Sequence, residues 1–308
     1  MTIADSIKFP LEVSHGIIKV IFIVRFTGEQ VMITKKDIQA VYQTHRILVR
    51  SNDFIYLLPH VALQNWISNY TITFPNENII SENYTGIPHG SATLVFCYDG
   101  KGLYGSLFGP ATKPCVVGSL ANQFEMLFII EFQPAGLYMF TGMEQKELAD
   151  QIIPFELINS MLNRLISETL YSTCSIHELI TSLDRLLLSN LHTAYPCELR
   201  LATQQIIETM GNISTKELSG SVHYSERHLN RIFNRYLGIN IKSLSRLVRI
   251  NKTIRLLRNP MNSITFASDY AGFYDLPHFI HEFKSVCGLT PQEYRSNMSD
   301  FYSEIAKF

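Results

Sequence analysis

The sequence predicts an α+β protein, with a β-rich N-terminal part followed by an all-helical C-terminal part. Short β-type runs separated by turn residues lie between Tyr70 and Met143, and two amphipathic helix patterns follow Pro154. Beyond them, one stretch of the sequence occurs twice, fifty positions apart. With 308 residues, 46% of them apolar, the chain is long enough for two separate hydrophobic cores.

The β-rich part contains four predicted strands, in the sequences YTITF, SATLVFCY, KPCVVGSL and EMLFIIEF. Around them lie IPHGS, YDGKGLYG, FGPA and QPAGL, in which Gly, Pro, Asp and Ser are typical of turns. Short strands punctuated in this way predict a compact β-barrel or sandwich.

Two amphipathic helices are predicted next, at residues 155–171 and 176–191. Their apolar residues recur at three- and four-residue spacing, so each helix has one apolar face. These residues are Ile158, Leu162, Leu165 and Ile166 in the first helix and Leu179, Ile180, Leu183, Leu186 and Leu187 in the second. Such a pair needs a partner, and we expect the two faces to meet across the two-fold axis of a homodimer. A charge placed at Leu162 or Leu183 would then separate the protomers.

The repeat predicts two copies of one small helical unit. Identical residues stand at Tyr224 and Tyr274, His228 and His278, Phe233 and Phe283, and Gly238 and Gly288. In the first copy, Ser214 with Glu217 predicts a capping box that starts a short helix. Ser225 predicts the start of a second, longer helix that ends at Gly238. A short helix, a tight turn and a longer helix are the pattern of a helix-turn-helix unit.

One face of the longer helix carries side chains suited to DNA bases. The apolar residues expected to face the core are Leu229, Ile232, Phe233 and Tyr236. The residues left outside are Arg227, Asn230, Arg231 and Asn234. Arg can donate two hydrogen bonds to guanine, and the amide of Asn can pair with adenine, so this face predicts base recognition.

Positive charge is concentrated in the same region. Residues 1–195 carry 12 Lys and Arg against 17 Asp and Glu, a net charge of −5, whereas residues 196–308 carry 14 against 10, a net charge of +4. The window from Arg227 to Arg258 holds nine basic residues and no acidic one, which indicates contact with a polyanion. Between the copies, INIKSLSRLVRINKTIRLLRN predicts one long helix that joins the two units.

The segment from Leu199 to Tyr294 resembles the DNA-binding domain of AraC/XylS-type transcriptional regulators. The resemblance rests on SERHLNRIFNRYLG, on RLVRI and IRLL in the joining helix, and on SITFASDYAGFYDLPHFIHEFKSVCGLTPQEYR. It implies two helix-turn-helix units whose second helices enter successive segments of the major groove of promoter DNA, and it implies RNA polymerase as a further partner. The family positions that face bases are here Arg227, Asn230 and Arg231 in the first unit and Leu276, Pro277 and His281 in the second. Phosphate contacts are expected from Lys242, Arg246, Arg255 and Lys284.

The second unit departs from the family pattern. An aliphatic residue, a proline and a histidine stand where relatives commonly carry Gln, Ser or Arg, and Ser268 replaces the usual Ala before the turn. Residues 259–308 hold three basic residues and six acidic ones. The signals for its fold remain, with Asp275 as a cap and Thr290 with Glu293 as a capping box. We therefore expect the first unit to dominate sequence recognition.

The N-terminal part resembles the cupin-like domain found on one subgroup of these regulators, from about Pro59 through FGPATKPCVV and FIIEFQPAGLYMFTGM. Such a domain binds an effector, dimerises the protein, or both, so the resemblance implies a small-molecule or peptide effector and a homodimer. It divides the chain into an N-terminal extension of uncertain fold at 1–58, a cupin-like domain with the helix pair at 59–195, and a DNA-binding domain at 196–308.

No catalytic, metal or cofactor site is predicted. The five cysteines lack C-x-x-C spacing, and His15, His45, His60 and His89 stand alone, without the clustered ligands of a cupin metal site. The sequence has no Gly-rich phosphate loop and no G-x-S-x-G. The apolar run GIIKVIFIVRF is too short to span a membrane. We expect a cytoplasmic regulator that is no enzyme; the alternative is a cupin-type metalloenzyme carrying a DNA-binding tail.

Overall fold

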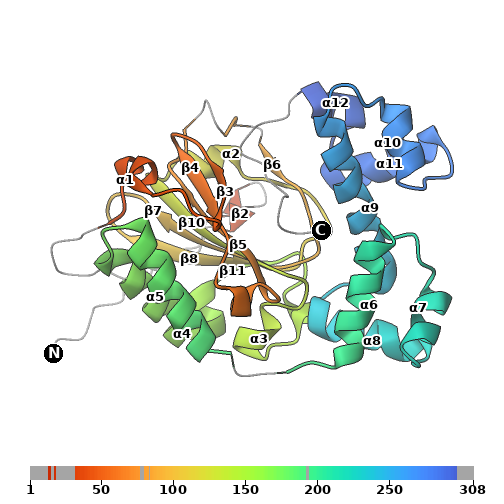
Figure 1. Ribbon diagram of the computed structural model, residues 1–308, viewed down its shortest axis with the longest axis horizontal. Helices are drawn as coiled ribbons and strands as arrows, with labels where there is room; N and C mark the ends of the chain where they lie inside the picture. Colours follow the sequence, from red (N-terminus) through yellow and green to blue (C-terminus); the bar gives the residue numbers. More distant parts are fainter. Residues whose placement is uncertain are drawn as a thin grey trace.

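Within the described part of the chain, the computed structural model places a seven-stranded antiparallel sheet beside a C-terminal group of helices (Figure 1). The structure describes residues 32–76, 80–82, 84–191 and 194–296, together with the backbone of residues 13, 14, 17 and 18. The predicted N-terminal extension covers residues 1–58. Its first 31 residues, apart from those four backbone positions, lie outside the described residues. The short strands β1 (Val13–Ser14) and β2 (Ile17–Ile18) pair with each other.

The central strand of the seven-stranded sheet is β10. Across the sheet lie β11 (Ile152–Pro154), β8 (Leu103–Phe108), β7 (Thr93–Tyr98), β10 (Met126–Phe132), β5 (Ile67–Thr73), β4 (Phe54–Leu57) and β3 (Ile47–Arg50). A separate pair is formed by β6 (Thr85–Gly86) and β9 (Cys115–Val116). Short helices are α1 (Lys35–Ala40), η1 (Val61–Leu63), α2 (Gly118–Ala121), α3 (Tyr138–Thr141) and η2 (Gln145–Glu147). Three of the four predicted strands are confirmed, as β5, β7 and β10.

Two segments differ from their sequence prediction. KPCVVGSL forms only the two-residue strand β9 before α2, because the amides of Val117 and Gly118 both donate to the carbonyl oxygen of Tyr84 and turn the chain. YDGKGLYG was expected to be a turn, yet its second half begins β8. The turn is confined to the start, where Oδ1 of Asp99 accepts from the amides of Lys101 and Gly102.

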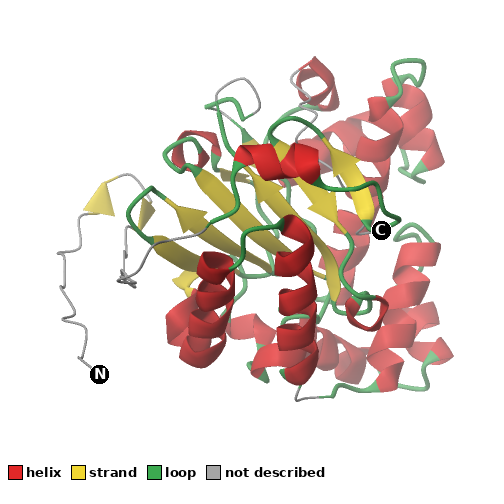
Figure 2. Cartoon of the chain, turned by 60° about the vertical axis from the view of Figure 1, so that its left-hand side comes forward, coloured by secondary structure: helices red, strands yellow, loops and turns green. Residues whose placement is uncertain are grey.

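The two faces of the sheet carry different apolar clusters, because successive residues of a strand point to opposite sides. In β4, Ile55 and Leu57 belong to the large cluster that includes helices α4 (Phe155–Ser172) and α5 (Ile176–Ser189). Phe54 and Tyr56 of the same strand belong to a smaller cluster on the other face. Both helices lie against one face of the sheet (Figure 2).

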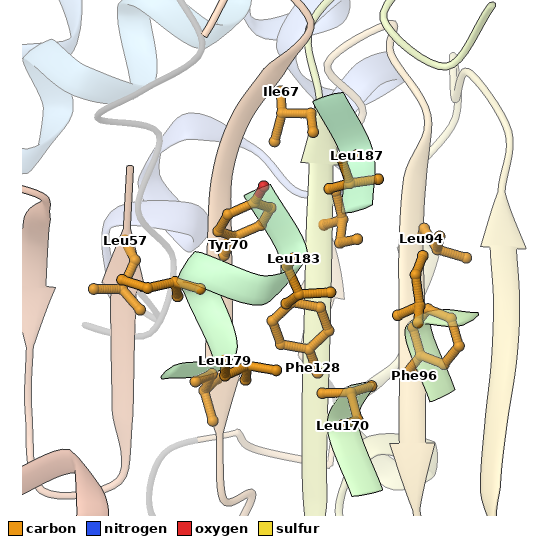
Figure 3. Close-up of a cluster of buried hydrophobic side chains, with 14 of the residues drawn as sticks. Leu57, Ile67, Tyr70, Leu94, Phe96, Phe128, Leu170, Leu179, Leu183 and Leu187 are labelled. Atoms are coloured by element: carbon orange, nitrogen blue, oxygen red, sulfur yellow. The ribbon is translucent and has the colours of Figure 1, made fainter. Parts of the chain in front are cut away.

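The apolar faces of α4 and α5 pack on the sheet, so they are not available to a second protomer. Leu162 is 2% exposed and Leu183 is fully buried. Figure 3 shows Leu179, Leu183 and Leu187 among the side chains of the sheet. The expected contact of these faces across a two-fold axis, through Leu162 and Leu183, is wrong, because the sheet is the partner of this face. The large apolar residues that α4 leaves exposed are Leu157 and Met161, at 64% and 60%.

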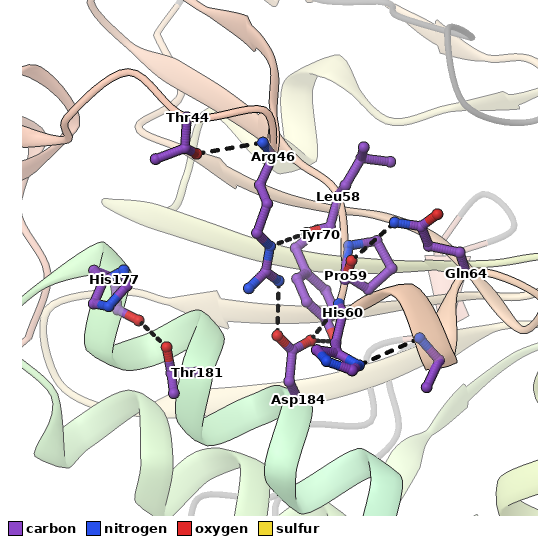
Figure 4. A network of polar contacts seen from close by, with 11 residues as sticks. Thr44, Arg46, Leu58, Pro59, His60, Gln64, Tyr70, His177, Thr181 and Asp184 are labelled. Carbon is purple, nitrogen blue, oxygen red and sulfur yellow. Dashed lines mark hydrogen bonds and ion pairs between the residues drawn. The ribbon is translucent and has the colours of Figure 1, made fainter.

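A buried carboxylate joins α5 to the chain on either side of β4 (Figure 4). Oδ2 of Asp184 lies 2.7 Å from Nη2 of Arg46, while Oδ1 accepts from the backbone amide of His60 at 2.9 Å and from the hydroxyl of Tyr70 at 3.1 Å. Nε of Arg46 donates to the carbonyl oxygen of Leu58. Burial, together with the negative charge of Asp184, raises the pKa of Tyr70 well above its usual value. The phenol therefore stays a hydrogen-bond donor.

This cluster also bears on the expected division of the chain at residue 58. Strand β4 pairs with β5, and Ile38, Ile55 and Leu57 lie in the same core as α4 and α5. Arg46 and His60 stand on opposite sides of the division and bind one carboxylate. Residues 33–57 are thus an integral part of the sheet domain, a contact pattern that no local feature of the sequence reveals.

The C-terminal part has seven helices in the described residues, and one of them lies at its centre. They are α6 (Cys197–Glu208), α7 (Thr215–Ser221), α8 (Glu226–Leu237), α9 (Ile241–Arg258), α10 (Ile264–Tyr270), α11 (Leu276–Cys287) and α12 (Pro291–Ser296). The predicted long joining helix is confirmed as α9. Buried apolar side chains lie on several sides of this helix. They are Ile241, Leu244, Leu247, Val248, Ile250, Ile254 and Leu257. The other six helices pack around it or around each other to complete one core.

We expect Asp184→Ala to lower the free energy of unfolding by about 3 kcal/mol, because the half-buried guanidinium of Arg46 and the buried hydroxyl of Tyr70 lose their partner. Asp184→Asn, which keeps an acceptor for Tyr70, should cost less. Arg164→Ala is the control, because it removes an exposed pair with Glu168 worth about 0.3–0.5 kcal/mol. Urea denaturation measures all three. Equal losses for Asp184→Ala and Arg164→Ala would contradict the role given to Asp184.

Candidate nucleic-acid interface

The first helix-turn-helix unit consists of α7, α8 and the turn between them. The capping box at its start is confirmed, since Oγ of Ser214 accepts from the amide of Glu217 at 3.2 Å and the Glu217 carboxylate accepts from the amide of Ser214 at 3.0 Å. Ser225 caps α8 by accepting from the amide of His228 at 3.2 Å. The helix ends at Gly238, whose φ of 78° is in the left-handed region that favours glycine. All three signals, which the sequence predicted, are confirmed.

The apolar face of α8 is oriented as predicted. Leu229, Ile232 and Phe233 are buried in the core around α9, and Arg227 and Arg231 are exposed. Nη2 of Arg231 lies 3.1 Å from Nδ1 of His228. The guanidinium is therefore already held by a neighbour on the same helix when it faces solvent.

His228 is a residue whose role the sequence did not predict. Its ring packs edge-on against Tyr224, with the ring centroids 4.6 Å apart. The phenol ring thus supports the imidazole, and the imidazole supports Arg231. The repeat gave the only signal, since Tyr224 and His228 are two of its identical positions.

Asn230 lies on the outward face but is bound locally. Its Nδ2 donates to the carbonyl oxygen of Glu226 at 3.1 Å, and its Oδ1 accepts from the amide of Ile241 at 3.3 Å. Ile241 is the first residue of α9, so this side chain fastens α8 to the joining helix. A base contact by Asn230 would have to replace these two hydrogen bonds. The spacing of residues in the sequence could not predict either bond.

The second unit consists of α10, α11 and the turn between them. Asp275 caps α11 by accepting from the amide of His278 at 2.7 Å, and Gly288 ends the helix with a φ of 78°. Pro277 and His281 are exposed, whereas Leu276 is half-buried against the core. The local fold of the two units is the same, while the outward side chains differ in their capacity for hydrogen bonds.

The four residues expected to contact phosphates lie in two different environments. Lys242 and Lys284 are exposed, and Arg246 and Arg255 are half-buried. Nε of Arg246 lies 3.8 Å from the carboxylate of Glu282 in α11. Arg246 therefore faces an anion within the protein, which weakens its candidacy as a phosphate ligand.

Arg249 belongs to the basic window, yet the structure places it between the two units. Its Nη1 donates to the carbonyl oxygen of Gly211, in the loop before α7, at 2.7 Å. Its guanidinium carbon lies 5.6 Å from the ring centre of Phe273, in the turn of the second unit. Burial lowers the pKa of Arg249 from its usual value. This arginine bridges the first unit, α9 and the second unit, and no pattern in the sequence distinguishes it from its exposed neighbours.

Among the described residues, no group of three His, Cys, Asp or Glu side chains is placed to hold a metal ion. Nδ1 of His89 lies 2.8 Å from Oγ of Ser91, in the turn that carries both. In the described ranges, no helix combines the length and apolar content needed to cross a membrane.

Known proteins resemble this chain in two separate regions. Residues 218–297 match a family described as a helix-turn-helix domain, and residues 56–154 match a domain of unknown function. The uncharacterized HTH-type transcriptional regulator YisR of Bacillus subtilis is 29% identical over 84 residues, which are 27% of this chain and 29% of YisR. This chain spans less than a third of the length of the curated relatives it matches.

Two solved structures resemble larger or smaller parts of the fold. A transcriptional regulator with an AraC-type DNA-binding domain from Chromobacterium violaceum is 28% identical, with a TM-score of 0.31, over 32% of this chain and 89% of that one. ToxT from Vibrio cholerae is 12% identical, with a TM-score of 0.38, over 79% of this chain and 96% of that one. The family match at residues 218–297 agrees with the two helix-turn-helix units that the structure shows.

We expect Arg249→Met to lower the free energy of unfolding by about 2 kcal/mol, because a charged hydrogen bond and a cation–π contact are lost. Arg231→Ala should leave stability nearly unchanged, because Arg231 is exposed. Denaturation without DNA measures both. A larger loss for Arg231→Ala than for Arg249→Met would contradict the placement of Arg249 between the units.

Proposed function

We propose that this protein is a sequence-specific DNA-binding transcriptional regulator that acts in the cytoplasm. The observation that carries the proposal is the pair of exposed arginines, Arg227 and Arg231, in the first two turns of α8. In helix-turn-helix proteins, the N-terminal residues of the second helix contact base edges in the major groove. An Arg in this place can donate two hydrogen bonds to O6 and N7 of guanine. The proposed partner is double-stranded promoter DNA, and RNA polymerase would be met there.

The proposed contacts to bases are unequal between the units. Arg227 and Arg231 supply the strong donors. Asn230 would contribute less, since it is bound to Glu226 and Ile241. In the second unit, Leu276 and Pro277 offer only apolar surface and His281 only one hydrogen bond, so we propose that this half of the site is selected mainly through DNA shape and backbone contacts.

Phosphate contacts would set the position of the chain on DNA without selecting sequence. We propose Lys242 and Lys284 for this role because both are exposed, one at the start of α9 and one on α11. Arg255 remains a candidate from its place near the end of α9. Arg246 would contribute only after leaving Glu282.

The sheet domain would sense an effector, form a homodimer, or both. The sheet face opposite α4 and α5 carries a buried polar row on β5, formed by Asn69, Thr71 and Thr73. Nδ2 of Asn69 donates to Oγ1 of Thr71, and Oγ1 of Thr73 has no hydrogen-bond partner among the described residues. We propose this row as the contact for a small polar effector. For a homodimer, the exposed Leu157 and Met161 on α4 are the proposed contact.

An enzyme carrying a DNA-binding tail receives no support from the relatives or from the arrangement of the described side chains. Promoter activation and repression both remain compatible with the proposal, because the DNA contacts are common to both. The function proposed for the whole chain thus depends on the AraC-type domain and its two exposed arginines.

The proposal is tested with the full chain and a duplex that it selects from a random library. We expect Arg231→Ala to weaken binding to this duplex by about 1–3 kcal/mol and to relax the preference at one base pair, since one bidentate contact is lost. His281→Ala is the matched change in the second unit and should cost less. Fluorescence anisotropy measures both. Failure of the parent chain to enrich any sequence would refute the proposed function, and a larger effect of His281→Ala would refute the assignment of residues.

A further inference from the structure

Helices α8 and α11, the second helices of the two units, are called the recognition helices below. The glycines that end them, Gly238 and Gly288, both lie against one loop of the sheet domain. This loop, residues 109–114, connects β8 to β9 and has a proline near each end. A Cβ added at Gly238 would lie 3.1 Å from Cγ of Pro110, and one added at Gly288 would lie 3.4 Å from Cγ of Pro114. Gly238 and Gly288 are equivalent positions of the repeat. One loop therefore touches both units at the same structural point.

A second segment of the sheet domain packs on the joining helix between those two contacts. A Cβ added at Gly90 would lie 2.7 Å from Cδ1 of Ile239 and 3.0 Å from Cδ1 of Leu247. Nδ2 of Asn251, a residue that is 1% exposed, donates to the carbonyl oxygen of Pro88 at 3.1 Å. Ile87 of the sheet domain also belongs to the core around α9. The two domains thus share a packed contact with a buried hydrogen bond, and not only a linker.

The end of the first recognition helix has further contacts with the sheet domain. Nε of Arg235 lies 3.2 Å from Oε1 of Glu144, and the ring of Tyr236 lies edge-on to Tyr138 with centroids 4.7 Å apart. A Cβ at Gly238 would approach the carbonyl oxygen of Gln145 to 2.6 Å. Backbone of the sheet domain is therefore in direct contact with the end of α8.

All of these contacts leave the DNA-facing ends of the helices free. Helix α8 has 12 residues, so with a rise of about 1.5 Å per residue its two ends are separated by roughly 17 Å. Arg227 and Arg231 lie toward the N-terminal end and are exposed, while Arg235, Tyr236 and Gly238 face the sheet domain at the other end. The contacts of the sheet domain thus lie at the C-terminal ends of these helices, away from Arg227 and Arg231.

We propose that the sheet domain acts as an intramolecular brace, which fixes the separation and the rotational phase of the two recognition helices along DNA. The proposal rests on the proposed DNA-binding function. Each unit is held at the C-terminal end of its recognition helix by the loop 109–114, and α9 is held between them by residues 87–90. A movement of either segment in the sheet domain would change the DNA spacing that the chain prefers.

The chain offers a matched pair of variants to test the brace. Gly238→Ala and Gly288→Ala introduce the same side chain at the same left-handed φ of 78°, so the local backbone strain is alike. Only the first brings Cβ to 2.6 Å from a backbone oxygen of the sheet domain, whereas the second makes an ordinary contact at 3.4 Å. The difference between them isolates the domain contact.

Binding is measured on the duplex selected by the parent chain and on a version with one base pair inserted between the half-sites. The insertion moves one half-site by about 3.4 Å and turns it by roughly 35°. We expect the parent and Gly288→Ala to lose at least about tenfold in affinity on insertion, and Gly238→Ala to lose less than about threefold, because a released unit can follow the groove. An equal loss for all three would overturn the brace, since α9 alone would then set the spacing. Tighter binding of Gly238→Ala to the original duplex would also overturn it, because the contact would then be an inhibitory latch.

Two further measurements test the brace, one with a second pair of variants and one without DNA. Glu144→Arg places like charges at the contact with Arg235, and Glu147→Arg in the same turn is its exposed control. Only Glu144→Arg should reduce the penalty of insertion. Amide hydrogen exchange without DNA should be faster at residues 87–90 and 144–148 in Gly238→Ala than in Gly288→Ala. Unchanged exchange would refute the brace even if no DNA sequence were selected, whereas failed selection alone refutes the proposed function.

Discussion

Both helix-turn-helix units depend on a single helix for their core. A unit built from two short helices has too few apolar residues to be stable by itself. Helix α9 supplies the missing surface, with Leu244 and Val248 buried in the same cluster as Phe233 of the first unit and Phe283 of the second. Of its buried polar residues, Thr253 donates to the carbonyl oxygen of Arg249, whereas Oγ of Ser245 has no hydrogen-bond partner among the described residues. Each unit thus depends on packing against α9 for its stability.

This shared support explains how one scaffold can serve two unequal surfaces. The features that build each unit are repeated, in the caps Ser225 and Asp275 and in the final glycines Gly238 and Gly288. The outward residues do not contribute to the core and are free to diverge. The first unit kept its exposed arginines, while the second exposes a proline and a histidine. Charge differs in the same way, since the window from Arg227 to Arg258 holds nine basic and no acidic residues, whereas residues 259–308 hold three basic and six acidic ones.

The sequence was sufficient for features that depend on neighbouring residues. The capping boxes at Ser214 and Thr290, the end of α8 at Gly238 and the long joining helix all follow from local spacing. The two helices after Pro154 were also predicted from periodicity. Local chemistry of this kind acts over one or two helical turns, which a single sequence displays directly.

Features that depend on distant contacts were not predictable. An apolar helix face does not state its partner, so the faces of α4 and α5 were assigned to a dimer and pack on the sheet. The sequence does not show whether a basic residue contacts DNA or another part of the protein. In the structure, Arg231 contacts a neighbour on its own helix. By contrast, Arg246 contacts Glu282 and Arg249 contacts Gly211, and both of these partners are distant in the sequence. Strand β8 was missed because its glycine at position 105 is typical of a turn. Each of these outcomes required contacts far apart in the chain.

The central claim is that two units of one scaffold, held by α9, contribute unequally to recognition. It is tested most directly by substituting every base pair of the selected duplex in turn and measuring the affinity of the full chain, with its orientation fixed by a DNA-cleaving reagent attached to α11. The account predicts losses of about 1–3 kcal/mol at base pairs under α8 and smaller losses under α11. Equal losses in the two halves, or larger losses under α11, would contradict it.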